Sequence, residues 1–540
     1  MSDNALVIGF ILFFVLASIA ITWWTSRSTK SAADFYVAGK GVPWIQVGIA
    51  MTGSYLSAAS FLGCAGDIGV FGVDSIWLSI GFFGGYMAVL MLIAGPLRNV
   101  GSYTVADALH RRFPDNKIKL MVMICTLIVS TFYLVPQMLG AGLLFEMLLG
   151  WNFVGVTVGL GILMSIYIIF GGMKATLYNQ VIQALFLWST MVIITLLAFF
   201  ITGHGSLAGI LEVANQAVPP ILAGKNPAVV EAVKNLAASD AIALGREMMP
   251  TADSVMTIGV KTSSTLAQIS TVIALVFGTA GLPHILIMFY TVPSARAAKK
   301  SVTLCIVALG IFYLCAIILG FLLIPAIYPK IVAWIAEGPK GVGLAKNMSV
   351  LVISKNLGGP WLMAIGAAGA VAAVLSTSAG LMITTASTIS HDLYKVFINK
   401  NATERQELNI AKITTLVMSA IAVVLAVTLK DQNVAWLVTL GFGIAASAIF
   451  PAMMANLWWK RATRQGVLSG IVVGLVVSLV FVYMLLSGQN TFLGLPTSGG
   501  PGVFGVTASI VVLVVVSLCT KDTGKNVEEF FAMAHKTDHD

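Results

Sequence analysis

Charged residues are scarce in this sequence of 540 residues: Asp, Glu, Lys and Arg make up 10% of it, whereas hydrophobic residues make up 58%. A soluble globular protein carries about 25% charged residues. The polar surface is therefore too small to keep a chain of 57.0 kDa in solution, and the mean hydropathy of +0.94 agrees with this. The composition predicts a polytopic membrane protein.

Other absences exclude further classes. The five cysteines lie in or beside apolar runs and form no C-x-x-C pair, which argues against a disulfide framework and a zinc site. The apolar residues do not alternate with polar ones, so an outer-membrane barrel is excluded. Met1–Asn4 has no basic residue and no cleavage site follows the first apolar run, so we interpret this run as a span and not as a signal peptide.

Long apolar runs fill the rest of the chain. A helix needs about 20 residues to cross a hydrocarbon core of about 30 Å. Apolar runs of this length, separated by polar segments, predict thirteen spans. They lie at about 5–24, 45–71, 75–97, 120–148, 152–172, 178–202, 266–291, 302–326, 360–387, 412–429, 433–457, 467–487 and 503–519.

The positions of the basic residues predict the orientation. If the first loop is cytoplasmic, 22 of the 31 Lys and Arg residues lie on inside segments, and eight of the other nine lie in the long loops 203–265 and 327–359. Long loops weigh little in the positive-inside rule. We therefore expect the N-terminus outside and the C-terminus on the cytoplasmic side of a cell membrane. The net charge of +9 then faces anionic lipid, and no nucleic-acid partner is indicated.

Two spans five positions apart carry small residues at mid-membrane. In the second span Gly53, Ser54 and Ser57 interrupt the apolar run, and in the seventh the segment 277–284 contains two glycines and a proline. Unwound backbone is tolerated in a membrane only where it lines a cavity. Close packing of helices would also use small residues, but the matched positions favour two broken helices in inverted repeats.

This symmetry divides the chain as an all-α transporter core with flanking helices. We expect a flanking helix and cytoplasmic loop at 1–44, a first five-helix repeat at 45–202, an extracellular loop at 203–265, a second repeat at 266–457 with its loop at 327–359, two flanking helices at 458–519 and a cytoplasmic tail at 520–540. Loop 203–265 is expected to form short helices, and the polar tail is expected to be mobile.

Ionisable groups are almost missing from the spans. Of the 22 acidic residues only Asp67 and Glu146 fall inside spans, both near an end, and His284 is the one histidine near a broken helix. Proton-coupled carriers usually place an ionisable group within the bilayer. Coupling through a central carboxylate is therefore disfavoured. Sodium, in contrast, can be held by backbone carbonyls at a helix break and by Ser or Thr hydroxyls, which are abundant here.

The densest hydroxyl cluster within a span runs from Ser376 to Ser378, followed by Thr384, Thr385, Ser387 and Thr388. A hydroxyl in a membrane helix more often bonds the carbonyl one turn before it than an ion. Both interpretations of this cluster stay open on the sequence alone.

Several motifs over about 30–460 together resemble the sodium:solute symporter family, and within it the bacterial acetate and monocarboxylate permeases. They are the segments 34–40, 55–63, 137–142, 171–176, 278–285, 289–296 and 390–394. The resemblance implies a five-plus-five inverted-repeat, LeuT-like fold with flanking helices, about 13 transmembrane helices in all.

The resemblance also implies a sodium site. Its ligands would be the carbonyls of Gly53, Leu56 and Ala373 and the hydroxyls of Ser376 and Thr377. Acetate permeases often carry apolar residues at the last two positions, so at this point the chain is closer to the sodium users of the family. Sodium is the expected coupling ion, and no other metal or cofactor is expected.

The substrate is expected between the two broken helices. Candidate residues there are Thr52, Tyr55, Ser57, Ala58, Ser60, Gln137, Phe277, Thr279 and Gly281, while Tyr133 and Phe277 could contact an alkyl chain. An anion would need no Lys or Arg, because a helix restarting near Ser57 offers free N–H groups and about half a positive charge.

The resulting hypothesis is sodium-driven uptake of a small monocarboxylate such as acetate by alternating access. Alternatives are the same carrier with an amino acid or another organic acid as solute, or coupling to protons. A membrane sensor is less favoured, because a tail of about 20 residues has no room for a kinase. An enzyme is not expected, because the spans contain no H-E-x-x-H motif, Cys/His pair or paired carboxylates. The sequence leaves the oligomeric state open.

Overall fold

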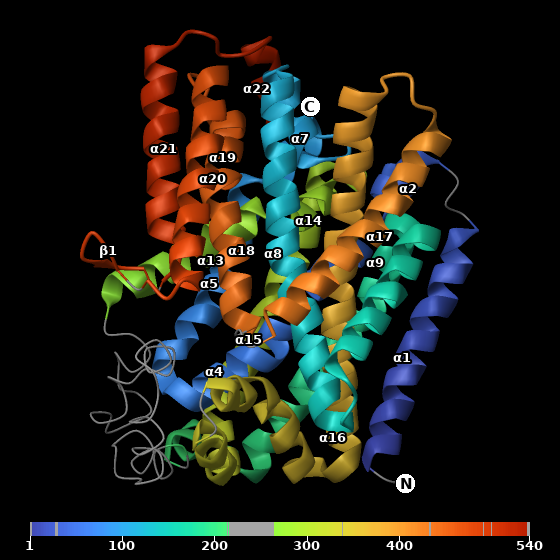
Figure 1. The fold of residues 1–540 in the computed structure, drawn as a ribbon, viewed down its shortest axis with the longest axis vertical. Coiled ribbons are helices and arrows are strands. Elements are labelled where there is room, and N and C mark those ends of the chain that lie inside the picture. Colours follow the sequence, from blue (N-terminus) through green and yellow to red (C-terminus); the bar gives the residue numbers. More distant parts are fainter. Residues whose placement is uncertain are drawn as a thin grey trace.

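The computed structural model describes residues 3–27, 31–212, 214, 264–336, 339–430, 434–489, 491–497 and 499–536, and these form a bundle of long helices (Figure 1). The elements are α1 (Asp3–Ser26), α2 (Ala32–Val37), η1 (Ala38–Lys40), α3 (Trp44–Tyr55), η2 (Ala59–Gly63), α4 (Cys64–Phe71), η3 (Gly72–Ser75), α5 (Ile76–Leu92), α6 (Ala94–Val100), α7 (Val105–Arg112), α8 (Asn116–Leu149), α9 (Phe153–Ile201), α13 (Thr265–Gly281), α14 (Pro283–Leu286), η4 (Ile287–Tyr290), α15 (Ala295–Ala336), α16 (Pro339–Ser387), η5 (Thr388–Ile398), α17 (Glu404–Thr428), α18 (Val434–Ala448), α19 (Phe450–Trp458), α20 (Arg464–Leu486), α21 (Gly502–Cys519) and α22 (Val527–Ala534). Strands β1 (Thr491–Phe492) and β2 (Leu495–Pro496) pair antiparallel in the only sheet of this described part.

Helix α9 contains two spans that run in opposite directions. Its 49 residues are interrupted at Gly172, which has φ 56° and ψ −154°. The first half runs alongside α1 from a groove lined by Ile8 and Gly155 to a close approach of Gly171 and Thr22. The second half then runs back along α1 to Phe186, whose ring centroid lies 4.3 Å from that of Phe14. Helix α9 thus reverses at Gly171–Gly172, between the two predicted spans.

The thirteen predicted spans all have a counterpart in the described residues. Length and hydropathy alone select ten helices, or eleven when the bent pair α13 and α14 is counted as one span. The reversal in α9 adds one. Gly72, with φ 65° and ψ −142°, separates α4 from α5 and so adds another span. Helices α3 and α4 then form one broken span, and α5 forms the next.

The two broken spans begin two units of five. The first unit is α3–α4, α5, α8 and the two halves of α9; the second is α13–α14, α15, α16, α17 and α18–α19. An odd number of crossings separates their starts, so the units have opposite orientations. Helices α1, α20 and α21 flank them. The structure has the predicted five-plus-five inverted-repeat fold.

Figure 1 shows the N-terminus and the C-terminus at opposite ends of the bundle, as an odd number of spans requires. The described part of loop 203–265 continues α9 at the N-terminal end; the expected short helices at 215–263 lie outside the described residues.

The prediction of a mobile tail is wrong for its described part. Helix α22 buries Phe530 and Phe531 against the C-terminal end of the bundle. The buried Arg112 guanidinium lies 5.1 Å from the Phe531 ring centroid and donates hydrogen bonds to carbonyls of the segment after α19, including that of Ala462. The tail seemed mobile because eight residues of amphipathic helix give no long apolar run.

Candidate functional site

The first helix break lies at Leu56–Ser57, at the end of α3. Helix α3 continues through Gly53 and Ser54, and its last bond joins the Leu56 amide to the Thr52 carbonyl. Leu56 then takes an extended conformation, with ψ 90°. Among the described residues no hydrogen bond is formed to the carbonyl of Gly53 or of Leu56. Both carbonyls, which the family resemblance implies as sodium ligands, are therefore available to bind an ion.

The second break lies at Leu282, between α13 and α14. Leu282 has φ −71° and ψ 113°, and the two helices meet at an angle of 40°. The two breaks are linked, because the hydroxyls of Tyr55 and Thr279 lie 2.7 Å apart. Tyr55 also donates to the Phe82 carbonyl on α5, at 2.9 Å.

Three consecutive hydroxyls on α16 have no partner in the described part of the chain. Ser376, Thr377 and Ser378 are fully buried, and none of their hydroxyl oxygens has a hydrogen-bond partner among the described residues. Further along the same helix, Thr384 donates to the Gly380 carbonyl and Thr385 to the Met382 carbonyl. Ser387 likewise donates to the Thr384 carbonyl. Backbone bonding thus accounts for these three later hydroxyls but not for the first three.

Gly53 brings the first break into contact with these hydroxyls. A Cβ atom at Gly53 would lie 3.0 Å from Ser376 Oγ, 2.7 Å from the Gln180 carbonyl oxygen and 2.8 Å from Ala184 Cβ. The backbone of α3 therefore approaches α16 and α9 at a distance that only glycine allows. Gly53, whose carbonyl has no partner among the described residues, thus lies next to a buried hydroxyl that also has none there, and neutral oxygens of these two kinds can bind a sodium ion.

Five of the nine predicted substrate residues fall into two groups. Ser57, Ala58 and Gln137 lie together: the Ala58 amide donates to Gln137 Oε1 at 3.3 Å, and Ser57 lies beside the Tyr133 hydroxyl, which is on α8 as Gln137 is. Gln137 Nε2 is buried without a partner among the described residues. Tyr55 and Thr279 form the link between the breaks described above.

The remaining candidates contact the scaffold. Thr52 donates to the Gly48 carbonyl, at 2.9 Å, and the hydroxyls of Ser60 and Tyr313 lie 3.1 Å apart. The ring of Phe277 stacks on Phe450 with centroids 4.4 Å apart, and a Cβ at Gly281 would lie 2.6 Å from the Ala445 carbonyl oxygen.

Two buried polar residues beside the breaks were not among the predicted ligands. Gln180 donates from Nε2 to the Ser376 carbonyl at 3.0 Å, and its Oε1 has no partner. His284 lies in α14 with its ring 5.4 Å from that of Tyr133, and neither ring nitrogen has a partner among the described residues. In the sequence, the one feature that could have indicated Gln180 and His284 is a polar amide or imidazole side chain within an apolar span.

Charged side chains cluster instead at the C-terminal end. Lys119 Nζ lies 2.9 Å from Asp107 and 3.0 Å from Asp392, and His391 lies between Asp107 and Glu407. Burial raises the pKa of the Asp107 carboxyl, but hydrogen bonding and charge interactions with His391 and Lys119 outweigh burial and hold that pKa below its usual range. Asp107, His391 and Asp392 are close enough to share a metal ion, but Lys119 already supplies the cation between the two aspartates.

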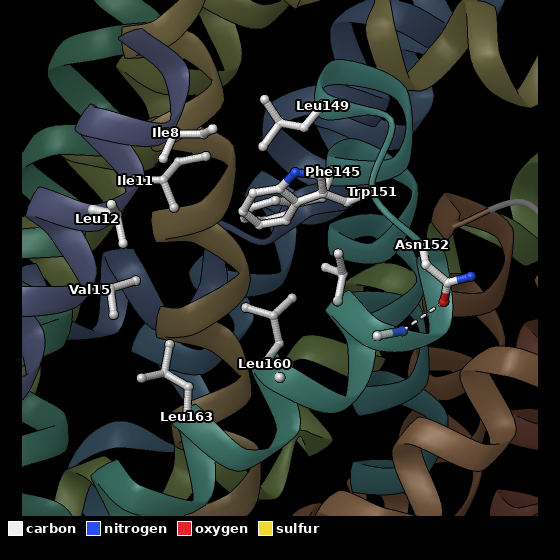
Figure 2. Close-up of a pocket in the computed structure, with 13 residues that line it drawn as sticks. Ile8, Ile11, Leu12, Val15, Phe145, Leu149, Trp151, Asn152, Leu160 and Leu163 are labelled. Atoms are coloured by element: carbon white, nitrogen blue, oxygen red, sulfur yellow. Dashed lines mark hydrogen bonds between the residues drawn. The ribbon is translucent and has the colours of Figure 1, made fainter. Parts of the chain in front are cut away.

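A groove of about 390 Å³ lies between α1 and the start of α9. Figure 2 shows Ile11, Leu12 and Val15 on one side and Leu160 and Leu163 on the other. Apart from Trp151 and Asn152 its side chains are apolar, and Asn152 is bonded to the Gly155 amide. Such a lining, with no charged side chain, suits lipid chains.

Comparison with known proteins decides the family. The model of the sodium:solute symporter family matches residues 35–474, most of the chain. The chain belongs to this family. The resemblance stated from the motifs is confirmed. Membership in a transporter family with this fold indicates a multi-pass membrane transporter rather than an enzyme, and it supports sodium as the coupling ion.

Relatives cover nearly the full length of this symporter. It is 36% identical over 497 residues to an uncharacterized symporter, YwcA, of Bacillus subtilis, spanning 91% of this chain and 89% of the relative. It is 37% identical over 493 residues to a monocarboxylic acid transporter of Corynebacterium glutamicum, spanning 90% and 85%. A solved Na+-coupled sialic acid symporter in a substrate-bound outward-open state shares its fold, with a TM-score of 0.72, 16% identity and coverage of 96% and 98%.

Proposed function

We propose that this symporter couples inward movement of sodium to uptake of a small monocarboxylate such as acetate by alternating access between the two repeats. The observation that carries the proposal is the close approach of Gly53 on α3 to the Ser376 hydroxyl on α16, which has no hydrogen-bond partner among the described residues. The carbonyls of Gly53 and Leu56 and the Thr377 hydroxyl, which also have no partner there, are the further proposed ligands. The Ala373 carbonyl, one turn earlier on α16, completes the proposed ligand set. The Corynebacterium relative described as a monocarboxylic acid transporter supports the substrate class.

The substrate carboxylate is proposed to bind between the breaks. Gln137 Nε2 offers a buried N–H donor, and the helix that restarts after Ser57 presents its N-terminal amides to the same region. A bound sodium ion adds a positive charge nearby. Neutral donors and one cation can thus hold a monoanion without Lys or Arg. Tyr133, beside Ser57, is the proposed contact for a short alkyl chain.

Sodium-driven uptake of acetate into proteoliposomes tests the ion site. With an inward sodium gradient, radiolabelled acetate should accumulate, and the double variant Ser376→Ala, Thr377→Ala should reduce the sodium-driven rate at least tenfold. The matched control is Thr385→Ala, Ser387→Ala on the same helix, whose hydroxyls bond their own backbone; it should stay within twofold. Sodium-independent uptake, or unchanged sodium dependence in the first variant, would contradict the mechanism.

The carboxylate site is tested by Gln137→Leu. Losing the donor to the substrate and the acceptor of the Ala58 amide should raise the substrate KM about 10- to 150-fold, since a lost hydrogen bond to a charged group costs about 1.5–3 kcal/mol. The sodium dependence should be unchanged. A panel of unlabelled amino acids and organic acids as competitors identifies the solute; competition by an amino acid but not by acetate would replace the proposed substrate.

Proton coupling is the second candidate, and His284 is the residue that favours it, because both its ring nitrogens are buried and have no partner among the residues that the structure describes. Under this alternative, a pH gradient without sodium drives uptake and His284→Gln abolishes it. Under the proposed mechanism, a pH gradient alone gives no accumulation.

We propose that the N-terminus lies outside and the C-terminus lies in the cytoplasm. This orientation rests on the excess of Lys and Arg in the segments on the same side of the membrane as the C-terminus. Cysteines introduced at the two termini and labelled with an impermeant maleimide on intact cells test it. Labelling of the C-terminal position from outside would reverse the assignment.

A further inference from the structure

A second groove, of about 210 Å³, lies at the C-terminal end of the bundle. Its walls come from the end of α5, from α6, from the start of α15, from the end of α19 and from the residues after α22. None of these residues belongs to the proposed sodium or substrate site, and the inference below does not depend on the proposed function.

The lining of this groove is basic. Arg296, Lys299, His535 and Lys536 line it, and the described residues of the lining include no Asp or Glu. Arg296 and Lys299 stand one turn apart on α15, so their side chains share one face of the helix. The stem of Lys299 crosses Gly95 of α6, where a Cβ would lie 2.8 Å from Lys299 Cε. The groove is thus built to present positive charge.

The edge of the groove is apolar and lies where membrane-crossing helices end. Trp458, the last residue of α19, is 47% exposed, and Met91, near the end of α5, is 74% exposed. The Trp458 indole donates to the Leu92 carbonyl, at 2.7 Å, which fixes the ring at this level. Trp is typical of the boundary between hydrocarbon and headgroups. Basic and apolar parts of the groove therefore meet at the depth of lipid headgroups.

The C-terminal tail completes the groove. Asn99 of α6 donates from Nδ2 to the carbonyls of Ala534 and Lys536, both at 3.1 Å. His535 Nε2 lies 2.9 Å from the Leu457 carbonyl oxygen, and its ring is 4.5 Å from that of Trp458. These contacts hold two of the basic residues beside the two contributed by α15.

From this arrangement we infer that the groove binds an anionic phospholipid, with the headgroup phosphate among Lys299, Lys536 and Arg296 and the chains along Trp458 and Met91. Basic pockets at the membrane surface are known to bind phosphate headgroups. The occupant is a lipid and not a free anion, because the exposed apolar edge faces the bilayer. The bound lipid would join the tail to α15, the first helix after the second broken span.

Lipid retention tests the inference on the full-length protein. The protein is purified from mixed bilayers of phosphatidylglycerol and phosphatidylcholine with the same chains, and retained lipids are counted by native mass spectrometry. The wild type should retain phosphatidylglycerol preferentially. Lys299→Gln, Lys536→Gln should weaken this binding about 30-fold, since each Lys near the surface attracts an anionic lipid by about 1 kcal/mol.

A matched control removes the same charge elsewhere. Lys117 and Lys521 are exposed and lie outside the groove, so Lys117→Gln, Lys521→Gln should retain phosphatidylglycerol as the wild type does. Equal loss in both double variants, or no loss in the groove variant, would overturn the inference. Displacement of the lipid by millimolar inorganic phosphate would also overturn it, because the site would then be one for a free anion.

Discussion

At mid-membrane this symporter buries polar groups without partners, whereas at its C-terminal end it buries charges that are paired. Ser376 and Thr377 have hydroxyls with no hydrogen bond among the described residues. Lys119, equally buried, lies within 3.0 Å of both Asp107 and Asp392. A buried polar group without a partner costs about 1–3 kcal/mol, so a protein keeps several of them together only where something else binds.

This difference separates the region that suits binding and release of the transported ion from the region that stabilises the fold. Neutral oxygens hold a cation without requiring a permanent counter-charge, and they release it when the helices shift. An ion pair inside a protein is strongly coupled once formed, and removing one partner costs about 3–5 kcal/mol. The unpartnered groups therefore suit transport, and the charge cluster suits a fixed joint between α7, α8, η5 and α17.

The largest expected effect comes from adding a methyl group at Gly53, where α3 closely approaches α9 and α16. In Gly53→Ala, the new methyl group would collide with the Gln180 carbonyl and with Ala184 Cβ, so sodium-driven uptake should fall at least 100-fold. Gly9→Ala in α1 is the control, because no atom lies within 4 Å of its added Cβ, and it should transport normally.

A binding readout separates loss of the site from loss of the fold. Sodium should raise the melting temperature of the purified wild type, since an ion that binds only the folded state stabilises it, but it should not raise that of Gly53→Ala. A sodium-dependent shift in the variant equal to that of the wild type would show that Gly53 does not form part of the ion site.

The second effect concerns stability at the C-terminal end. Lys119→Met removes the cation between the buried Asp392 carboxylate and the partly buried Asp107 carboxylate, and the free energy of unfolding should fall by about 3–5 kcal/mol. Lys430→Met breaks an ion pair with Glu146 in which both side chains are more than one third exposed, and it should cost at most about 1 kcal/mol. Thermal unfolding in detergent measures the loss of stability in both variants. Equal losses would show that the Lys119 cluster contributes no more to stability than the exposed Lys430–Glu146 pair.

Apolar runs were sufficient to predict the spans, because 20 apolar residues have few alternatives to crossing a membrane. Even the reversal within α9 followed from the short polar interval after Gly172. Helices α7 and α22 were not predicted, because short amphipathic helices at a membrane surface leave no such run. The charge cluster at Asp107 and His391 was missed for a related reason: its members come from four separate elements, and only tertiary packing brings them together.

Sequence patterns located the two helix breaks to within a few residues. The first begins at Leu56, not at Gly53, whose role is to allow the close approach of α16. Motif positions proposed Ser376 and Thr377, but only the structure separates their unpartnered hydroxyls from the backbone-bonded ones of Thr384 and Thr385. Gln180 and His284 could not be assigned, because a polar residue in a span gives no indication of the neighbour it faces.

The smallest expected effect tests whether the C-terminal end is only a joint. The Tyr36 hydroxyl lies 2.7 Å from Ser390 Oγ, and its ring packs near His391. Tyr36→Phe keeps the ring and removes one hydrogen bond, which should lower the free energy of unfolding by about 1 kcal/mol and leave the uptake rate within twofold. If the uptake rate instead fell tenfold with little change in melting temperature, this end would have to move during transport, and the paired charges would belong to the mechanism as much as the unpartnered hydroxyls do.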